Sequence, residues 1–228
     1  MNRRIGRREY ERLVEGAKVL ESDHFGVKVW LRPDGRIVKL FRTKRLVSSA
    51  RLYPYSSRFV RNARRLEKLG IRVPGVEGSF HCPQIRRHGV IYRLLPGKSL
   101  AELLGESPDA TLVARLAAFL AELHEKGIYF RSVHPGNVLL TDDDRLGLID
   151  LQYARFWPWP LGARTRSRNF RHLFHSRHQS VALRNFGFAA FVDLYLAAVP
   201  RPQGYRDRLR RHILAYEGIW KQGRVQSQ

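Results

Sequence analysis

Two residues in the middle of the chain could bind the metal ion that accompanies a nucleotide. Asn137 and Asp150 stand at opposite ends of a predicted hairpin, whose strands, near residues 138–140 and 146–151, are joined by a turn at Asp142 to Asp144. Because a hairpin returns its ends to the same side, an amide oxygen and a carboxylate could converge on one ion. Mg²⁺ accepts such sparse oxygen ligation and fills its other positions with water and phosphate. The spacing therefore predicts a magnesium and nucleotide-phosphate site.

The elements that must position these residues begin with another hairpin, within residues 21–41. Apolar and polar residues alternate over 27–31, and the turn sequence Arg32-Pro-Asp-Gly35 follows. The second strand, 37–41, carries Lys39, which by itself would be a solvent-facing strand lysine. A helix is predicted over 57–69, with apolar residues on one face and arginines on the others.

The second half of the chain is mainly helical by pattern. Ser99 to Glu102 form a capping box, and a long helix capped by Ser107 and ended by Gly127 carries leucines at helical spacing. An Arg-rich loop precedes helical patterns over 181–199 and 206–220. Strands first and helices later predict an α+β chain of two lobes.

The order of these motifs resembles a known family. The runs Leu123-His124-x-x-Gly127-Ile128, His134-Pro-Gly-Asn137-Val-Leu-Leu140 and Leu148-Ile-Asp150 resemble the core of protein-kinase-like phosphotransferases, in the form found in aminoglycoside and lipopolysaccharide kinases. The short length, the many arginines and the run Phe130-Arg-Ser-Val-His134 are similar to the Kdo and heptose kinases of lipopolysaccharide cores, including toluene-tolerance and InaA-like proteins.

The resemblance implies a bilobal kinase fold, with a small β-rich lobe over 1–95 and a mainly helical lobe over 96–228. It implies an ATP-dependent phosphotransferase that uses Mg²⁺ and acts on a sugar of the lipopolysaccharide inner core at the cytoplasmic face of the inner membrane. Asn137 and Asp150 would hold the metal, and Asp150 would also be catalytic.

Further site residues follow from the same resemblance. Lys39 would hold the nucleotide phosphates, Glu67 would pair with Lys39, and Arg93 and Leu95 would belong to the hinge that receives the adenine. Phe59 stands near the position where the family has the glutamate, which makes Glu67 the remaining carboxylate in that helix.

Three departures from the family pattern concern catalysis. Ser132 stands where the catalytic aspartate is expected, and a neutral hydroxyl does not accept a proton at pH 7 as a carboxylate does. His134 is a candidate base in the same loop, although a structural loop histidine is the alternative. The glycine-rich loop retains only Gly26, and the glutamate partner of Lys39 is displaced. A pseudokinase, which binds nucleotide or a partner without transfer, is therefore the chief alternative.

The composition predicts an anionic partner. Lys and Arg number 42 against 20 Asp and Glu, a formal net charge of +22. Nucleic acid, an anionic membrane and a phosphorylated glycolipid all satisfy this charge, as does a nonspecific basic surface. Arg164, Arg166 and Arg168 follow a Trp-rich run and are the candidate substrate residues; an ordinary rigid loop is the alternative.

The location expected from the sequence is the cytoplasm, with peripheral contact to the inner membrane. Cys82 is the single cysteine, so no intramolecular disulfide forms, and no apolar run approaches the roughly 18 residues that cross a bilayer. A nucleic-acid-associated kinase-like protein is a third reading, and the oligomeric state is left open.

Overall fold

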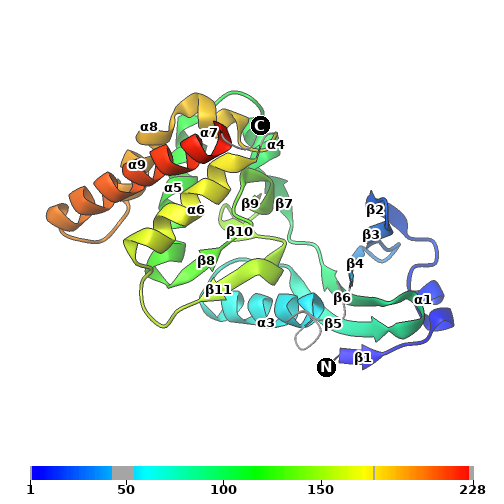
Figure 1. Cartoon of the computed structure of the whole chain (residues 1–228). Helices are drawn as coiled ribbons and strands as arrows, with labels where there is room; N and C mark the ends of the chain where they lie inside the picture. The colour runs from blue at the N-terminus through cyan, green and yellow to red at the C-terminus, as the bar shows by residue number, and fades with distance from the viewer. Residues whose placement is uncertain (1, 43–53, 177, 226–228) are drawn as a thin grey trace. The chain divides into compact units, whose positions relative to one another are not determined.

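The chain folds into two compact units. A computed structural model describes residues 2–42, 54–176 and 178–225, and Figure 1 labels its elements. The first unit comprises Met1–Pro96 together with Leu148–Tyr153, and the second comprises Gly97–Gly147 and Ala154–Gln228. The first is rich in strands and the second is mainly helical, so the α+β expectation is confirmed. The short segment Leu148–Tyr153, expected in the second lobe, belongs to the first unit.

Six strands of the described residues form one sheet in the first unit, in the order β1-β5-β6-β4-β3-β2. β1 is parallel to β5, and the other neighbours are antiparallel. The predicted hairpin is confirmed as β3 and β4, and the predicted helix as α3. The elements of this unit are β1 (Asn2–Arg4), α1 (Arg7–Leu13), β2 (Lys18–Asp23), β3 (Gly26–Leu31), β4 (Arg36–Arg42), α3 (Tyr55–Lys68), β5 (Gly75–Cys82), η1 (Pro83–Ile85), β6 (Arg87–Arg93) and η3 (Leu151–Tyr153).

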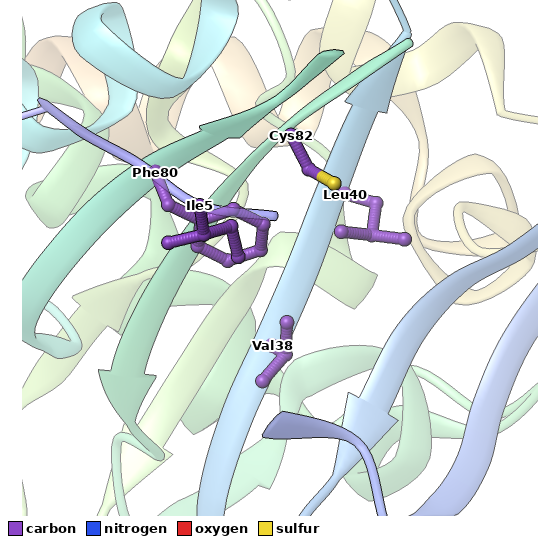
Figure 2. Packing of buried hydrophobic residues seen from close by; sticks show 5 residues of the cluster. All are labelled: Ile5, Val38, Leu40, Phe80 and Cys82. Carbon is purple, nitrogen blue, oxygen red and sulfur yellow. The ribbon is translucent and has the colours of Figure 1, made fainter. Parts of the chain in front are cut away.

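Strand β4 has apolar side chains on both faces, which is why its sequence is almost continuously apolar. One face contributes Val38 and Leu40 to a cluster with Ile5, Phe80 and Cys82, all less than 10% exposed (Figure 2). Tyr10 and Leu13 of α1 pack against this cluster. The cluster joins strands that are distant in sequence.

The other face of β4 packs against α3. The ring of Phe59 on α3 lies 6.3 Å from that of Phe41 and stacks on that of Tyr92 at 5.3 Å. Phe59 therefore occupies the inner face of α3, where the resemblance implied a glutamate. Lys39 lies between Ile37 and Phe41 on this same side of the strand.

The second unit is built around α5, whose buried residues include Leu116, Leu120 and Leu123. Within the described residues of this unit no helix has the length and apolar character needed to cross a membrane, and the same holds for the first. Its elements are β7 (Gly97–Ser99), α4 (Leu100–Leu104), α5 (Ala110–Glu125), β8 (Ile128–Phe130), η2 (Pro135–Asn137), β9 (Val138–Thr141), β10 (Leu146–Leu148, whose last residue belongs to the first unit), β11 (Ala154–Phe156), α6 (Ala163–His175), α7 (Val181–Phe186), α8 (Phe188–Ala197) and α9 (Gln203–Val225).

Several local predictions for this unit need correction. Asp109, rather than Ser107, caps α5, and its carboxylate accepts hydrogen bonds from the amides of Thr111 and Leu112. The helix expected over 181–199 is broken into α7 and α8 at Gly187, whose φ is 100°. The Arg-rich segment expected as a loop is helix α6. The capping box at Ser99 is confirmed.

The cluster of Figure 2 generates a stability prediction. Replacing Phe80, which is 2% exposed, by Ala should lower the free energy of unfolding by about 3 to 5 kcal/mol, through lost burial and a residual cavity. Urea unfolding followed by circular dichroism measures this change. Val19→Ala is the control, because Val19 is 44% exposed, and it should change stability by less than about 0.5 kcal/mol. Equal effects of the two substitutions would contradict the assigned core.

Candidate functional site

Lys39 and Asp150 form an ion pair within the first unit, although 111 positions separate them in sequence. The lysine ammonium contacts the Asp150 carboxylate, and their side chains are 17% and 23% exposed. Both side chains are thus mostly buried, with part of each still exposed. Lys39, which the resemblance implies for the nucleotide phosphates, and Asp150, which the hairpin pattern predicts for the metal, are thus brought together.

Asp150 adopts an uncommon backbone conformation. Its φ is 62°, in the left-handed region that few residues other than glycine occupy. Aspartate tolerates this region better than most residues, and such conformations concentrate at functional sites. The Gln152 amide nitrogen donates to the same carboxylate at 2.9 Å. The carboxylate is therefore fixed by two donors.

The segment that carries Asp150 is attached to the first unit through its backbone. Asn62 on α3 donates from Nδ2 to the Leu151 carbonyl at 2.8 Å, and the Leu148 amide donates to the Arg72 carbonyl at 2.9 Å. Asn62 could not be predicted from the sequence, because a buried asparagine on a helix has no distinctive spacing. These bonds fix the position of the Asp150 backbone relative to α3.

Asn137 lies in a second arrangement, within the second unit. Its Nδ2 donates to the Ser132 carbonyl at 3.0 Å and to His134 Nε2 at 3.0 Å. Both bonds use the amide nitrogen, so the amide oxygen is left to serve as a metal ligand. The loop thus orients the side chain that the hairpin pattern predicted.

The same bonds bear on the two candidates for a catalytic base. His134 Nε2 accepts from Asn137, which occupies the lone pair that would take a proton. Ser132 contributes its carbonyl to the loop, and its hydroxyl does not accept a proton at neutral pH. His134 therefore positions Asn137 in this structure.

The start of this loop is held by a buried chain of hydrogen bonds. Arg166 donates to the Tyr195 hydroxyl at 2.8 Å, and that hydroxyl lies 2.9 Å from His124 Nδ1. His124 Nε2 lies 3.1 Å from Asn169 Oδ1, and Asn169 donates to the Phe130 carbonyl at 2.8 Å. Because Asn169 Oδ1 only accepts, His124 Nε2 carries the proton and Nδ1 accepts from Tyr195. The chain ends two residues before Ser132.

The arginines predicted to contact substrate occupy different environments. Arg166 is 0% exposed, and it also binds the Glu125 carboxylate at 2.7 Å and the Leu161 carbonyl at 2.6 Å. The prediction that Arg166 contacts substrate is therefore wrong, because its guanidinium is committed inside the fold. Arg164 and Arg168 are exposed on α6.

The remaining predicted site residues lie in the first unit. Glu67 is exposed on α3, and Lys39 is paired with Asp150. The helix presents Phe59 and Asn62 to the interior instead, so the expected pairing of Glu67 with Lys39 is not found. Arg93 ends β6 and donates to Glu77 at 2.7 Å, and Leu95 is half-buried just beyond it.

The donor set is sparse. Among the described residues no three His, Cys, Asp or Glu side chains gather as a metal cage. A carboxylate such as that of Asp150 in the first unit, or an amide oxygen such as that of Asn137 in the second, is a ligand that Mg²⁺ accepts, because this ion retains waters and binds through substrate phosphates. Each of the two residues fits such an ion by its chemistry.

Neither a family model nor a curated protein matches the chain. Among solved structures, it is similar to the bifunctional kinase-methyltransferase WbdD, at 18% identity and a TM-score of 0.48, over 84% of this chain and 47% of that one. A co-crystal structure of WbdD with the kinase inhibitor LY294002 is similar at 17% identity and a TM-score of 0.48, over 83% and 43%. The chain spans less than half the length of these solved chains.

Arg166 generates a prediction that separates folding from binding. Arg166→Met should lower the free energy of unfolding by about 3 to 5 kcal/mol, because removing one partner of a buried ion pair leaves its hydrogen-bond partners uncompensated. Arg164→Met removes the same charge from an exposed position of α6 and should leave stability unchanged. Denaturant midpoints measure both. A stable Arg166→Met protein would contradict the buried network.

His124 generates a pH prediction. Burial lowers the pKa of His124 from 6.5 to about 3, with the charge of Arg166 acting in the same direction. The unfolded chain then binds a proton that the folded chain excludes, so the free energy of unfolding should fall as pH drops from 6.5 towards 3, by up to about 1.4 kcal/mol per pH unit.

The comparison protein is His124→Gln, which keeps one donor and one acceptor and does not titrate. Its stability deficit relative to wild type should shrink as pH falls from neutrality, because only wild type loses the His124 contribution. Urea midpoints across pH measure the difference. A deficit that is constant with pH would show that His124 is not the neutral, buried group described above.

Proposed function

We propose that the chain is a kinase-like phosphotransferase that uses ATP with Mg²⁺, and that its acceptor is a sugar of the lipopolysaccharide inner core at the cytoplasmic face of the inner membrane. The pairing of Lys39 with Asp150 carries the proposal. A lysine beside a carboxylate in a half-buried site matches the needs of a polyphosphate and its metal ion. The acceptor is supported by the sequence resemblance and by the net charge of +22.

Each residue has a distinct task in this proposal. Lys39 would orient the α- and β-phosphates, while Asp150 and the amide oxygen of Asn137 would hold magnesium. Bound magnesium supplies neutralisation of the charge that develops on the phosphates. Arg93 and Leu95 would border the adenine. Binding of the nucleotide would exchange the Lys39–Asp150 contact for contacts to phosphate and metal.

In the transfer step the acceptor hydroxyl oxygen forms a bond to the γ-phosphorus as the bond to ADP breaks. The hydroxyl proton must then leave. Ser132 does not take it, and His134 Nε2 is occupied by Asn137, so the proton would pass to solvent or to the transferred phosphate. Positioning and charge neutralisation still act, so we expect slow transfer.

A pseudokinase is the second candidate, and the loop around Ser132 favours it. Without a group in this loop that takes the acceptor proton, transfer is slow. A protein that only binds nucleotide or a partner does not need such a group. The nucleic-acid-associated reading is supported by the basic charge alone. Peripheral membrane contact is supported by Trp159, which is 63% exposed near the Arg-rich helix.

The decisive measurement is transfer of labelled γ-phosphate to purified lipopolysaccharide core acceptors. We expect slow transfer by wild type, none by Asp150→Asn, and a rate increase of about 10²- to 10⁴-fold in Ser132→Asp, which supplies a general base. Ser132→Asn is the matched control, because it adds the same bulk without the charge.

Two results would redirect the proposal. If Ser132→Asp transfers nothing while wild type binds ATP in a magnesium-dependent manner, the chain is a pseudokinase. If Lys39→Ala and Asp150→Asn bind nucleotide as wild type does, the nucleotide site itself is misassigned.

A further inference from the structure

Helix α6 carries two faces with different roles. Phe170, Leu173 and Phe174 are buried in the second unit, together with Arg166. The opposite side presents side chains at helical spacing, three, four and seven positions after the first. These side chains are Arg168, Arg171, His172 and His175.

These residues line a cavity of about 420 Å³ in the second unit. Strands β8 and β11 supply another side of it, because Arg155 lies opposite Tyr129 in their antiparallel register. Arg131 follows β8 directly, and Tyr216 comes from α9. Among the residues that the structure describes, the lining is Tyr129, Arg131, Arg155, Arg168, Arg171, His172, His175 and Tyr216.

The described lining of the cavity includes four arginines and no carboxylate. Glu125, which ends α5 shortly before β8, is engaged by Arg166 and Arg201. Across the described part of the chain, none of the four lining arginines forms an ion pair. Four guanidinium groups that converge without compensation repel one another, so an anion in the cavity would be stabilised.

The floor of the cavity is polar but uncharged at neutral pH. Burial lowers the pKa of His172 to about 4, with Arg131, Arg171 and Arg168 acting in the same direction. Its Nε2 lies 2.9 Å from the Tyr129 hydroxyl, and Tyr129 is 7% exposed. The floor thus offers hydrogen-bonding groups to a ligand whose charge the arginines would balance.

We propose that this cavity binds a phosphate monoester. Guanidinium groups bind phosphate through paired hydrogen bonds, and a dianion balances several positive charges where a carboxylate balances one. The cavity volume suits a small polar ligand or a headgroup, whereas nonspecific polyanion binding would use an open surface. The site lies wholly in the second unit and shares no residue with Lys39 and Asp150.

The inference does not require phosphoryl transfer. A transferase would use the cavity to hold a phosphorylated acceptor, and a binding protein would use it alone. Tests without nucleotide, in the Lys39→Ala background, therefore separate this cavity from the proposed nucleotide site.

The experiment is calorimetric titration of the full chain with inorganic phosphate and with glucose 6-phosphate, and with glucose as the uncharged control. Arg168→Gln/Arg171→Gln should weaken binding of the phosphates roughly 10- to 100-fold. Arg208→Gln/Arg211→Gln is the matched control, since it removes two exposed charges at the same helical spacing from α9. It should bind as wild type does.

A third variant, Arg168→Lys/Arg171→Lys, keeps the charge but removes the planar fork, and it should lose part of the affinity. If the α6 and α9 double glutamine variants lose equal phosphate affinity, general charge explains the binding and the proposal is overturned. Phosphate affinity equal to that of wild type in the α6 double glutamine variant would also overturn it. Absence of phosphate binding by the wild type would also overturn it. Thermal unfolding confirms that each variant is folded.

Vesicles distinguish a lipid headgroup from a soluble phosphate. Phosphatidylcholine vesicles containing phosphatidic acid present a monoester, and vesicles with phosphatidylglycerol at equal charge present a diester. Preference for phosphatidic acid that is lost in the α6 pair supports a lipid-borne monoester. Binding of glucose 6-phosphate without a preference for phosphatidic acid vesicles supports a soluble ligand. Equal binding to both kinds of vesicle that the α6 double glutamine variant retains would show that the cavity does not bind membrane lipids.

Discussion

The second unit depends on one buried chain of polar contacts, which runs from Arg166 through Tyr195, His124 and Asn169 to the Phe130 carbonyl. It crosses α6, α8 and α5 and ends at the strand that leads into the loop of Ser132 and Asn137. Such a network is stabilising only when every member is satisfied, because an unpaired buried group costs about 1 to 3 kcal/mol. It also requires His124 to be neutral. Packing alone would hold these helices together, but it would not fix the direction in which the loop begins.

In the first unit an ion pair, rather than a chain of hydrogen bonds, joins segments that are distant in sequence. Lys39 comes from the middle of a sheet and Asp150 from a short segment that the chain reaches much later, and α3 holds that segment through Asn62. The carboxylate is placed by a left-handed backbone conformation rather than by a long side chain. The two units therefore each contain a fixed polar side chain, Asp150 in one and Asn137 in the other.

Local patterns predicted much of this architecture. The β3–β4 hairpin, α3, the capping box at Ser99 and α5 follow from signals within a few residues of each element. The chain from Arg166 to Phe130 could not be predicted, because its members are far apart in sequence and charged residues usually lie at the surface. Strand β5 is rich in glycine and polar residues, and its pairing with β6 on one side and with the distant β1 on the other makes it a strand. For the site, the hairpin spacing indicated Asn137 and Asp150 and the family resemblance indicated Lys39, while Asn62 and the partner of Lys39 needed the tertiary structure.

The two faces of α6 have a consequence for how this protein can change over time. Arg166 and Arg168 point to opposite sides of α6. Arg166 is buried and binds Tyr195, Glu125 and Leu161, whereas Arg168 lines the cavity. If the ligand were no longer present, the cavity arginines could be replaced during evolution and the protein would still fold. Replacement of Arg166 would instead destabilise the fold and so reduce the amount of protein in the cell. Related chains that retain Arg166 and vary Arg168 would thus indicate a change of ligand, although the two positions lie within a single turn of helix.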